Sequence, residues 1–299
     1  MQSKILPPPL KPGDLLKVIA PSGALRELEA FGQSVEIWRS RGYQVDIMPK
    51  LGDKWGYLAG KDENRRKQLA AAWEDPECRG ILCTRGGFGS TRILENWNWH
   101  SNPTPPKWLI GFSDITALLW SLYTAGIASV HAPVLTTLAE ETDWSIQRLF
   151  DFVEGRPVPP LKGCGWGGGI ATGLLLPGNL TVTTHLLATS IIPHLDDVIL
   201  AWEDVTEAPY RIDRMLTQWR LSGALSKVRG IALGDFTKCE PPPNVPSFSV
   251  AEVLRDRLGD LGIPIVSDLP FGHDCPNAAL PAGVLATLDA DQGILSISH

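Results

Sequence analysis

The sequence has no apolar run long enough to cross a bilayer, which takes about 18 consecutive apolar residues. Its apolar stretches are short, as at Leu174–Leu176, which is followed at once by Pro177-Gly. Prolines also interrupt the first ten residues before a signal-peptide core could form. We therefore expect a soluble, cytoplasmic protein that does not bind membranes.

Cysteine is scarce and scattered. A disulfide framework or a zinc knuckle requires closely spaced pairs, and the chain has no C-x-x-C and no H-E-x-x-H. We expect free thiols, no metal and no cofactor. The cysteines are Cys78, Cys83, Cys164, Cys239 and Cys275, of which the last lies two residues from His273.

Basic runs and basic–aromatic stripes are absent as well, and the formal net charge of −6 is spread along the chain. A nucleic-acid partner is therefore not expected. Hydrophobic residues make up 43% and charged residues 20% of the 299 residues, close to the globular average. The chain is long enough for one large or two ordinary α/β domains.

The first half alternates short apolar strands with helical patterns, which is typical of a parallel sheet covered by helices on both faces. Ligands bind such sheets at the carboxyl ends of the strands. The expected strands cover residues 15–20, 43–48, 80–84 and 108–111, and the expected helices cover 25–41, 63–73 and 115–123.

The second half repeats these signals with more turns, and it predicts a smaller mixed α/β domain. Residues 141–169 are rich in glycine and proline and are interpreted as a linker or long loop between the two. The predicted domains are therefore 1–140 and 170–299.

An apolar strand runs into a serine and then directly into a helix at Trp108-Leu-Ile-Gly-Phe-Ser-Asp-Ile. This is the context of a nucleophile elbow, in which a tight turn exposes Ser113 beside a helix N-terminus. The usual second glycine is replaced by Ile115, so the motif is half matched. The alternative is that Ser113 or Asp114 only caps the helix.

A second turn, Arg85-Gly-Gly-Phe-Gly-Ser, follows the preceding strand. Paired glycines allow close backbone approach and offer N–H donors, but no G-K-[ST] or G-x-G-x-x-G spacing supports nucleotide binding. The loop is interpreted as a source of an oxyanion donor for the serine. A tight turn without further function is the alternative.

A serine nucleophile needs a base and an orienting carboxylate. Among the histidines, His273 lies in a Gly/Pro-flanked loop after a strand, where catalytic residues are common, while His131 and His194 also stay open. Glu203 ends an apolar strand and Glu207 competes with it. Glu203 and Asp204 are expected to point to opposite faces and not to act as a pair.

Six motifs, in this order along nearly the whole chain, resemble the LD-carboxypeptidase family, which includes the microcin-C immunity peptidases. They are Ile19-Ala-Pro-Ser-Gly, Arg85-Gly-Gly-Phe-Gly-Ser, Gly111-Phe-Ser-Asp, Gly178-Asn-Leu, Glu203-Asp-Val-Thr-Glu-Ala-Pro-Tyr-Arg-Ile-Asp-Arg and Gly272-His-Asp-Cys-Pro-Asn. The resemblance implies a flavodoxin-like N-terminal α/β domain, a smaller C-terminal α/β domain, an active site between them and a homodimer.

The resemblance also implies a triad of Ser113, Glu203 and His273, with the backbone N–H groups of Gly87 and Asp114 as the oxyanion hole. The implied reaction removes the terminal D-alanine from a muropeptide tetrapeptide during cell-wall recycling. The substrate-binding candidates are Arg85, Gly86, Arg92 and Arg211, and the sequence does not choose which arginine binds the substrate's carboxylate.

Three alternatives remain beside this interpretation. The enzyme could hydrolyse peptide–nucleotide conjugates, with Trp166 of the glycine-rich loop 163–169 stacking on the base. The chain could be a binding protein for muropeptides without catalysis, although intact triad positions speak against it. A Cys275 nucleophile is disfavoured because this residue shares a loop with His273 and has no elbow.

Overall fold

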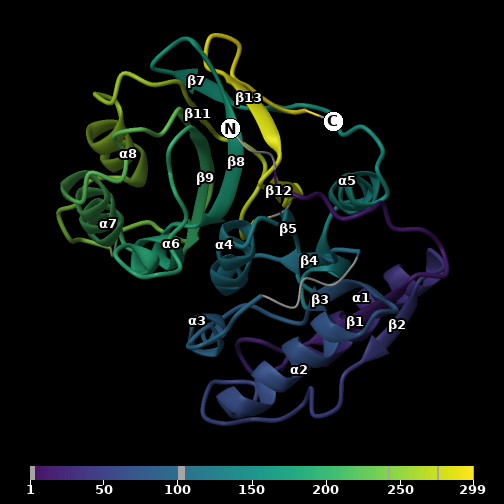
Figure 1. Cartoon of the computed structure of the whole chain (residues 1–299). Coiled ribbons are helices and arrows are strands. Elements are labelled where there is room, and N and C mark those ends of the chain that lie inside the picture. Colours follow the sequence, from purple (N-terminus) through teal and green to yellow (C-terminus); the bar gives the residue numbers. More distant parts are fainter. Residues whose placement is uncertain (1–3, 100–104, 242, 275, 299) are drawn as a thin grey trace.

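A computed structural model describes residues 4–99, 105–241, 243–274 and 276–298 of the chain. The predicted α/β class is confirmed, since two β-sheets with helices packed against them make up the molecule (Figure 1). The first sheet has the order β12-β5-β4-β3-β1-β2. Its strands are β1 (Leu15–Ile19), β2 (Gln44–Ile47), β3 (Cys78–Cys83), β4 (Trp108–Gly111), β5 (Ser129–His131) and β12 (Leu280–Ala282).

The five strands from the first half pair in parallel, and β12 pairs antiparallel with β5. Parallel strands point their carboxyl ends to one edge, so the turns after β3 and β4 lie next to each other. Strand β5 and strand β12 were not foreseen in the sequence. With β12, a segment from the end of the second half completes the first sheet.

The second sheet, expected to belong to the smaller half, has eight strands in the order β6-β14-β13-β8-β9-β10-β11-β7. Its centre, β8 to β11, is parallel, and its flanks are antiparallel. The strands are β6 (Leu161–Lys162), β7 (Cys164–Trp166), β8 (Ile170–Asn179), β9 (Val198–Val205), β10 (Gly230–Thr237), β11 (Ile265–Ser267), β13 (Leu285–Asp289) and β14 (Ile294–Ile297).

The segment interpreted as a linker, residues 141–169, contains regular structure. Helix α5 (Asp143–Val153) begins at Thr142, whose side-chain oxygen accepts from the Ser145 N–H. Strands β6 and β7 then pair at the two edges of the second sheet. The boundaries proposed at residues 140 and 170 stay a prediction.

The remaining helices flank the sheets, and α4 lies between them, in contact with both β5 and β8 (Figure 1). The α-helices are α1 (Leu28–Ser40), α2 (Asp62–Glu74), α3 (Ser90–Ile93), α4 (Thr116–Thr124), α6 (Leu180–Leu186), α7 (Pro209–Leu221) and α8 (Val250–Leu258); short 3₁₀ turns are η1 (Ser113–Ile115) and η2 (Leu138–Glu140). Within the described ranges, no helix has the length and apolarity needed to cross a membrane.

One hydrophobic core runs from α4 into the second sheet. Trp120 of α4, Trp202 of β9 and Trp219 of α7 are fully buried, with ring centroids 6.5 Å apart for Trp120–Trp219 and 4.8 Å for Trp202–Trp219. The Trp120 indole N–H donates to the Pro177 carbonyl at 2.8 Å, so its polar atom is satisfied. Burial of these three rings in one cluster stabilises the packing of α4 against the second sheet.

Candidate active site

Ser113 occupies a strained turn between β4 and α4. Phe112 is extended, whereas Ser113 has φ = 61°, a conformation that costs a non-glycine residue about 1–3 kcal/mol. The turn is tight, because a Cβ on Gly111 would lie 3.0 Å from the Ile115 side chain. Ile115, at the position of the usual second glycine, is fully buried and fills core space. The structure therefore has the elbow geometry despite the half-matched motif.

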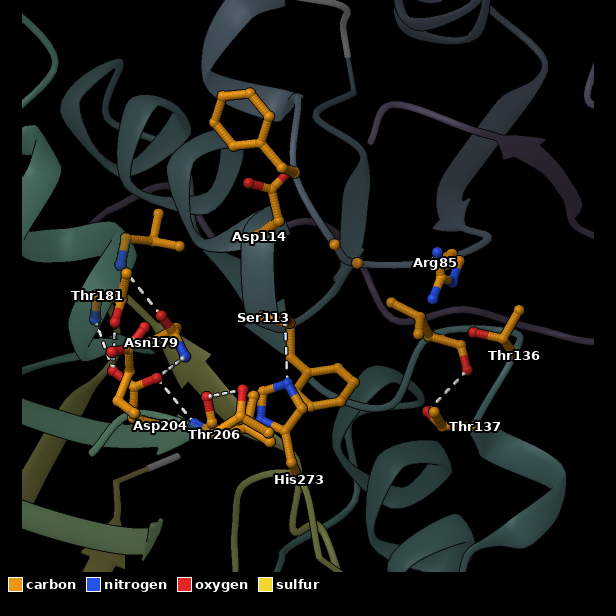
Figure 2. A pocket seen from close by; sticks show the side chains of 18 of the residues that line it. Arg85, Ser113, Asp114, Thr136, Thr137, Asn179, Thr181, Asp204, Thr206 and His273 are labelled. Carbon is orange, nitrogen blue, oxygen red and sulfur yellow. Dashed lines mark hydrogen bonds between the residues drawn. The ribbon is translucent and has the colours of Figure 1, made fainter. Parts of the chain in front are cut away.

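His273 meets this serine from the loop after β11. Its Nε2 lies 3.1 Å from Ser113 Oγ, and its Nδ1 lies 2.5 Å from Glu203 Oε2 (Figure 2 shows the contact with Ser113). Gly272, with φ = 137°, precedes it; a Cβ there would lie 3.2 Å from the Cβ atoms of Asp235 and Glu203. The ring also packs on Phe112, with centroids 4.8 Å apart.

The carboxylate of Glu203 is fully buried at the end of β9. Burial alone would lower the pKa of His273, but the charge and the hydrogen bond of Glu203, together with the charges of Asp204 and Asp274, outweigh burial, so the pKa of His273 is raised above its ordinary 6.5. Glu203 and Glu207 were the two candidates for the orienting carboxylate, and in the structure Glu203 contacts His273. Glu207 instead forms an ion pair with Arg211 at 3.4 Å.

Glu203 and Asp204 were expected to point to opposite faces and not to act as a pair; both approach the side chain of Asn179, and the expectation that they do not act as a pair stays a prediction. The side-chain amide of Asn179 donates to Glu203 Oε1 at 3.3 Å and to Asp204 Oδ1 at 3.2 Å. The pairing of β10 with β9 shifts register between Leu233 and Phe236, opposite Glu203, and such a bulge re-aims neighbouring side chains. Burial and the charge of Glu203 raise the pKa of Asp204 to about 6.

The glycine loop lies directly against the serine. A Cβ on Gly86 would lie 2.9 Å from Ser113 Oγ and 3.6 Å from the Asp114 backbone nitrogen. Gly87 follows with φ = 103°, a conformation that favours glycine. Among the described residues, neither the Gly87 nor the Asp114 N–H donates to a protein acceptor. These two donors are the pair that the resemblance assigns to an oxyanion hole.

The Asp114 side chain fastens this loop to the elbow. It is 2% exposed, and it accepts from Ser22 Oγ at 2.5 Å and from the Ser90 N–H at 2.8 Å. Burial raises the pKa of Asp114, while the hydrogen bonds from Ser22 and Ser90 oppose that rise. Three segments that are distant in sequence are thus joined at one carboxyl group.

A cavity of about 660 Å³ opens above Ser113 and His273. In Figure 2, Arg85, Thr136 and Thr137 lie on one side of Ser113, and Asn179, Thr181 and Asp204 lie on the other. The wall also contains Glu27, Gly86, Gly87, Phe88, Thr91, Phe112, Asp114, Val134, Glu140, Val182, His185, Val205, Thr206 and Glu207. This volume suits a short peptide.

Of the three candidate arginines, one lines the cavity and two do not. Arg85 lines the cavity and forms an ion pair with Glu27 at 3.2 Å. Arg92 donates to both oxygens of Asp62 and is not part of the lining. Arg211 pairs with Glu207 on the outer side of α7 and does not line the cavity either. Among the described lining residues, Arg85 is the arginine available to a substrate.

Among the described residues, His131, His185 and His194 form no hydrogen bond with Ser113. His131 is fully buried at the end of β5, burial lowers its pKa to about 4, and neither ring nitrogen has a hydrogen-bond partner among the described residues. His185, for which the sequence suggested no role, lines the cavity from α6. His194 is exposed in the loop before β9 and lies outside the cavity wall.

One residue of the site, Asn179, was missed in the sequence. It directly follows Gly178 in a quoted motif, but its contact with Glu203 exists only because strands β8 and β9 are paired.

The remaining candidates from the sequence lie outside the cavity wall or outside the described residues. Trp166 lies on the edge strand β7, with Arg255 over its ring, and is not in the cavity wall. Cys275 lies outside the described residues. Within the described ranges, no cluster of three metal-ligating side chains is found.

Comparisons with known proteins agree over most of the chain. The sequence model of the LD-carboxypeptidase N-terminal domain matches residues 16–132, and that of the LD-carboxypeptidase C-terminal domain matches residues 172–288. A putative carboxypeptidase of Synechocystis is 57% identical over 290 residues, covering 97% of this chain and 96% of that protein. The murein tetrapeptide carboxypeptidase of Pseudomonas aeruginosa is 30% identical, with 92% and 93% covered.

Solved structures share the architecture. The muramoyltetrapeptide carboxypeptidase from Oxalobacter formigenes superposes with a TM-score of 0.84 at 27% identity, covering 95% of this chain and 97% of that one. The microcin C7 self-immunity protein, in complex with aspartyl sulfamoyl adenosine, gives 0.89 at 21% identity, covering 99% and 98%. At that identity the second likeness shows the fold alone.

Proposed function

The chain belongs to the LD-carboxypeptidase family, and we propose that it is a serine hydrolase that releases the terminal D-alanine from murein tetrapeptides in cell-wall recycling. The observation that carries the proposal is the hydrogen-bonded row Ser113–His273–Glu203 at the floor of the cavity, with 3.1 Å and 2.5 Å between successive partners. Nucleophile, base and orienting carboxylate are thus in the order that a serine hydrolase needs.

In the first half-reaction, His273 Nε2 takes the proton of Ser113 Oγ as this oxygen attacks the carbonyl carbon before the terminal residue. Glu203 accepts from His273 Nδ1, keeps the ring in the productive tautomer and stabilises the imidazolium that forms. The imidazolium then gives its proton to the departing amine, which leaves as the free D-amino acid. Water, deprotonated by His273, then attacks the acyl-serine ester. His273 returns this proton to Ser113 Oγ as the ester bond breaks, which releases the shortened peptide and regenerates the free serine.

The negative oxygen of the tetrahedral intermediate needs donors that are already in place. The Asp114 N–H directly follows Ser113, and the Gly87 N–H belongs to the loop whose Gly86 lies against Ser113. Both suit this role because neither donates to an acceptor among the described residues. Removing one such donor typically costs about 3 kcal/mol of transition-state stabilisation. The N-terminal end of the helix that follows adds a favourable dipole for the same charge.

A carboxypeptidase must also recognise a free carboxylate. Arg85 fits this role because it lines the cavity with Ser113, and its partners among the described residues, the half-exposed Glu27 at 3.2 Å and the Ala24 carbonyl at 3.4 Å, leave its guanidinium N–H groups to spare. A guanidinium binds a carboxylate by two parallel hydrogen bonds. In this arrangement the terminal D-residue lies on the Arg85 side, with Thr136 and Thr137, and the rest of the peptide extends toward Thr181.

The test is release of D-alanine from a diaminopimelate-containing tetrapeptide by the wild type and by Ser113→Ala. We expect release by the wild type and its loss in the variant, with an unchanged circular dichroism spectrum. If the wild type releases nothing, the muropeptide substrate is rejected. A peptide–nucleotide conjugate is then assayed in the same way, and binding of the tetrapeptide without turnover would identify a binding protein.

We further propose, from the family resemblance, that the protein is a cytoplasmic homodimer. Light scattering coupled to gel filtration gives the mass directly, against 32.6 kDa for one chain. A mass of one chain at micromolar concentration contradicts the dimer. Cell fractionation against a periplasmic marker tests the location.

A further inference from the structure

Asn179 is the last residue of β8, and its side chain is 4% exposed between the two carboxylates of β9. Its Nδ2 donates to Glu203 Oε1 at 3.3 Å and to Asp204 Oδ1 at 3.2 Å. An amide nitrogen carries two hydrogens, so each carboxylate receives one. Figure 2 shows this side chain beside Asp204, on the side of Ser113 that faces away from Arg85.

The orientation of this amide is fixed by its other end. Asn179 Oδ1 accepts from the Val182 N–H at 3.1 Å and caps the N-terminus of α6. A flipped amide would turn its oxygen toward Glu203 and Asp204 and remove the donor that Glu203 Oε1 has in the structure, which is unfavourable in a buried site, whereas Asp204 Oδ1 would keep the Val205 N–H. The helix cap thus directs the two N–H bonds at the carboxylates.

The backbone of Asn179 connects the same residue to the nucleophile. Its N–H donates to Thr116 Oγ1 at 3.0 Å, and Thr116 is the first residue of α4, three positions after Ser113. The close approach requires Gly178, where a Cβ would lie 2.5 Å from Thr116 Cγ2 and 3.1 Å from Trp120 Nε1. Contacts therefore run from Ser113 through Thr116, Asn179, Glu203 and His273 and return to Ser113.

We propose that Asn179 is a positioning residue for the reaction: its amide fixes Glu203 relative to the Ser113 helix and supplies the hydrogen bond for the carboxylate oxygen that His273 leaves free. The inference rests on the proposed function. Glu203 has one oxygen on His273 and the other on Asn179. Without the amide, the carboxylate can rotate, and its Oε1 loses the donor that the structure shows for it, next to the carboxyl group of Asp204.

Asn179→Ser is the informative variant, because a serine retains the helix cap but cannot reach both carboxylates. We expect kcat to fall by about 10- to 100-fold, as is common when a residue behind a reacting group is removed, with KM changed less than twofold. Asn179→Ala should lose the same activity. If serine restores activity that alanine loses, the residue acts as a cap only and the proposal is overturned.

A double-mutant cycle shows whether the effect acts through Glu203. In a Glu203→Gln background, Asn179→Ser should cost less than about threefold, because the carboxylate to be positioned is gone. An equal loss in both backgrounds overturns the proposal. Thr142→Ala is the matched control, since it removes a cap hydroxyl from α5, away from the cavity, and should lower stability without lowering kcat.

The pH profile supplies a readout that a purely structural role would not move. The titratable groups around Glu203 are His273, Asp204, Asp235 and His131, from four different segments. When the amide is lost, the charge of Glu203 is no longer shared with a hydrogen bond from Asn179, so it attracts the imidazolium of His273 more strongly. The pKa of His273 should therefore rise, and the acid limb of kcat/KM should move to higher pH. An unmoved limb together with an unchanged kcat contradicts the proposal.

If Asn179→Ser does not fold, Asn179→Asp serves instead, because it keeps the size and the cap. It replaces the two N–H donors of the amide by an oxygen of a third carboxylate group beside Glu203 and Asp204. The loss of kcat should therefore be at least as large as that of Asn179→Ser. In wild type, the His273 Nδ1 proton should give a low-field NMR resonance, which the variant should shift or lose. Wild type without activity rejects the proposed function, whereas active wild type with an equally active variant rejects only this inference.

Discussion

The two sheets contribute to the site in different ways. The first supplies backbone: the turn with positive φ at Ser113, and the glycine loop at Gly86 and Gly87, both at the carboxyl ends of neighbouring parallel strands. The second supplies side chains: Glu203 from β9 and His273 from the loop after β11. The first sheet should therefore be sensitive to an added Cβ, and the second to a changed charge or hydrogen bond.

The largest loss of kcat is expected when a side chain supplied by the second sheet is removed. His273→Ala removes the base while the elbow and the glycine loop stay intact, and kcat should fall by about 10⁴-fold or more. Combining it with Ser113→Ala should add little, because residues that act as a unit are strongly non-additive. D-alanine release by the single and double variants measures this, and additive losses would show that the two residues do not act together.

Glu203→Gln is expected to lower kcat by roughly 10³- to 10⁴-fold, because the ring of His273 loses its orienting acceptor and its counter-charge. The acid limb of kcat/KM should move to lower pH, since the charge of Glu203 no longer raises the pKa of His273. Glu207→Gln is the comparison, because Glu207 pairs with Arg211 instead. An equal loss of kcat in both variants would contradict the assignment of Glu203.

In the glycine loop of the first sheet, Gly86→Ala should lower kcat by about 10²- to 10³-fold with little change in KM. The new Cβ would lie 2.9 Å from Ser113 Oγ and displace it. Gly32→Ala is the matched control. A Cβ on Gly32 meets nothing within 4 Å, and the residue lies within α1. That control should keep full activity and gain up to about 1 kcal/mol of stability, measured by urea unfolding.

In the wild type, kcat/KM should fall as the pH falls through the pKa of His273, because only the neutral ring accepts the serine proton. The midpoint should lie above 6.5, since Glu203, Asp204 and Asp274 together raise that pKa more than burial lowers it. The profile is measured with the tetrapeptide at low substrate concentration. A midpoint below 6.5 would mean that burial dominates at this histidine.

The smallest effect is expected for Ser22→Ala. It removes a hydrogen bond to the Asp114 carboxyl group, while the Ser90 N–H still holds that group in place. We expect a loss of about 1 kcal/mol, seen as a several-fold decrease in kcat. If kcat falls as much as in Gly86→Ala, the hydrogen bond from Ser22 to the Asp114 carboxyl group is essential for positioning the Gly87 and Asp114 N–H groups, which contradicts this prediction.

The difference between the two sheets also explains what the sequence could predict. The elbow at Ser113 and the glycine loop are local signals, because strand, turn and helix are contiguous. Glu203 and His273 are 70 residues apart, and their pairing was supported by the family resemblance rather than by any local pattern. Asn179 was missed for the same reason: its partners come from β9 and α4, and only strand register brings them together.

The missed strands follow the same rule. Strands β6 and β7 have two and three residues, in a segment whose glycines favour a loop on composition alone. They exist because the edges of the second sheet pair with them. Similarly, β12 is three residues long and contains Pro281, so its place beside β5 is a property of the assembled molecule.

That placement of β12 has a consequence for how the chain is made. Strand β5 emerges from the ribosome long before its neighbour β12, which follows nearly the whole second sheet. At 5–20 residues per second, the gap of about 150 residues leaves the β5 edge open for roughly 8–30 s. An open edge invites pairing with other chains, so we expect the β5 edge to be accessible to other chains and to chaperones during this interval.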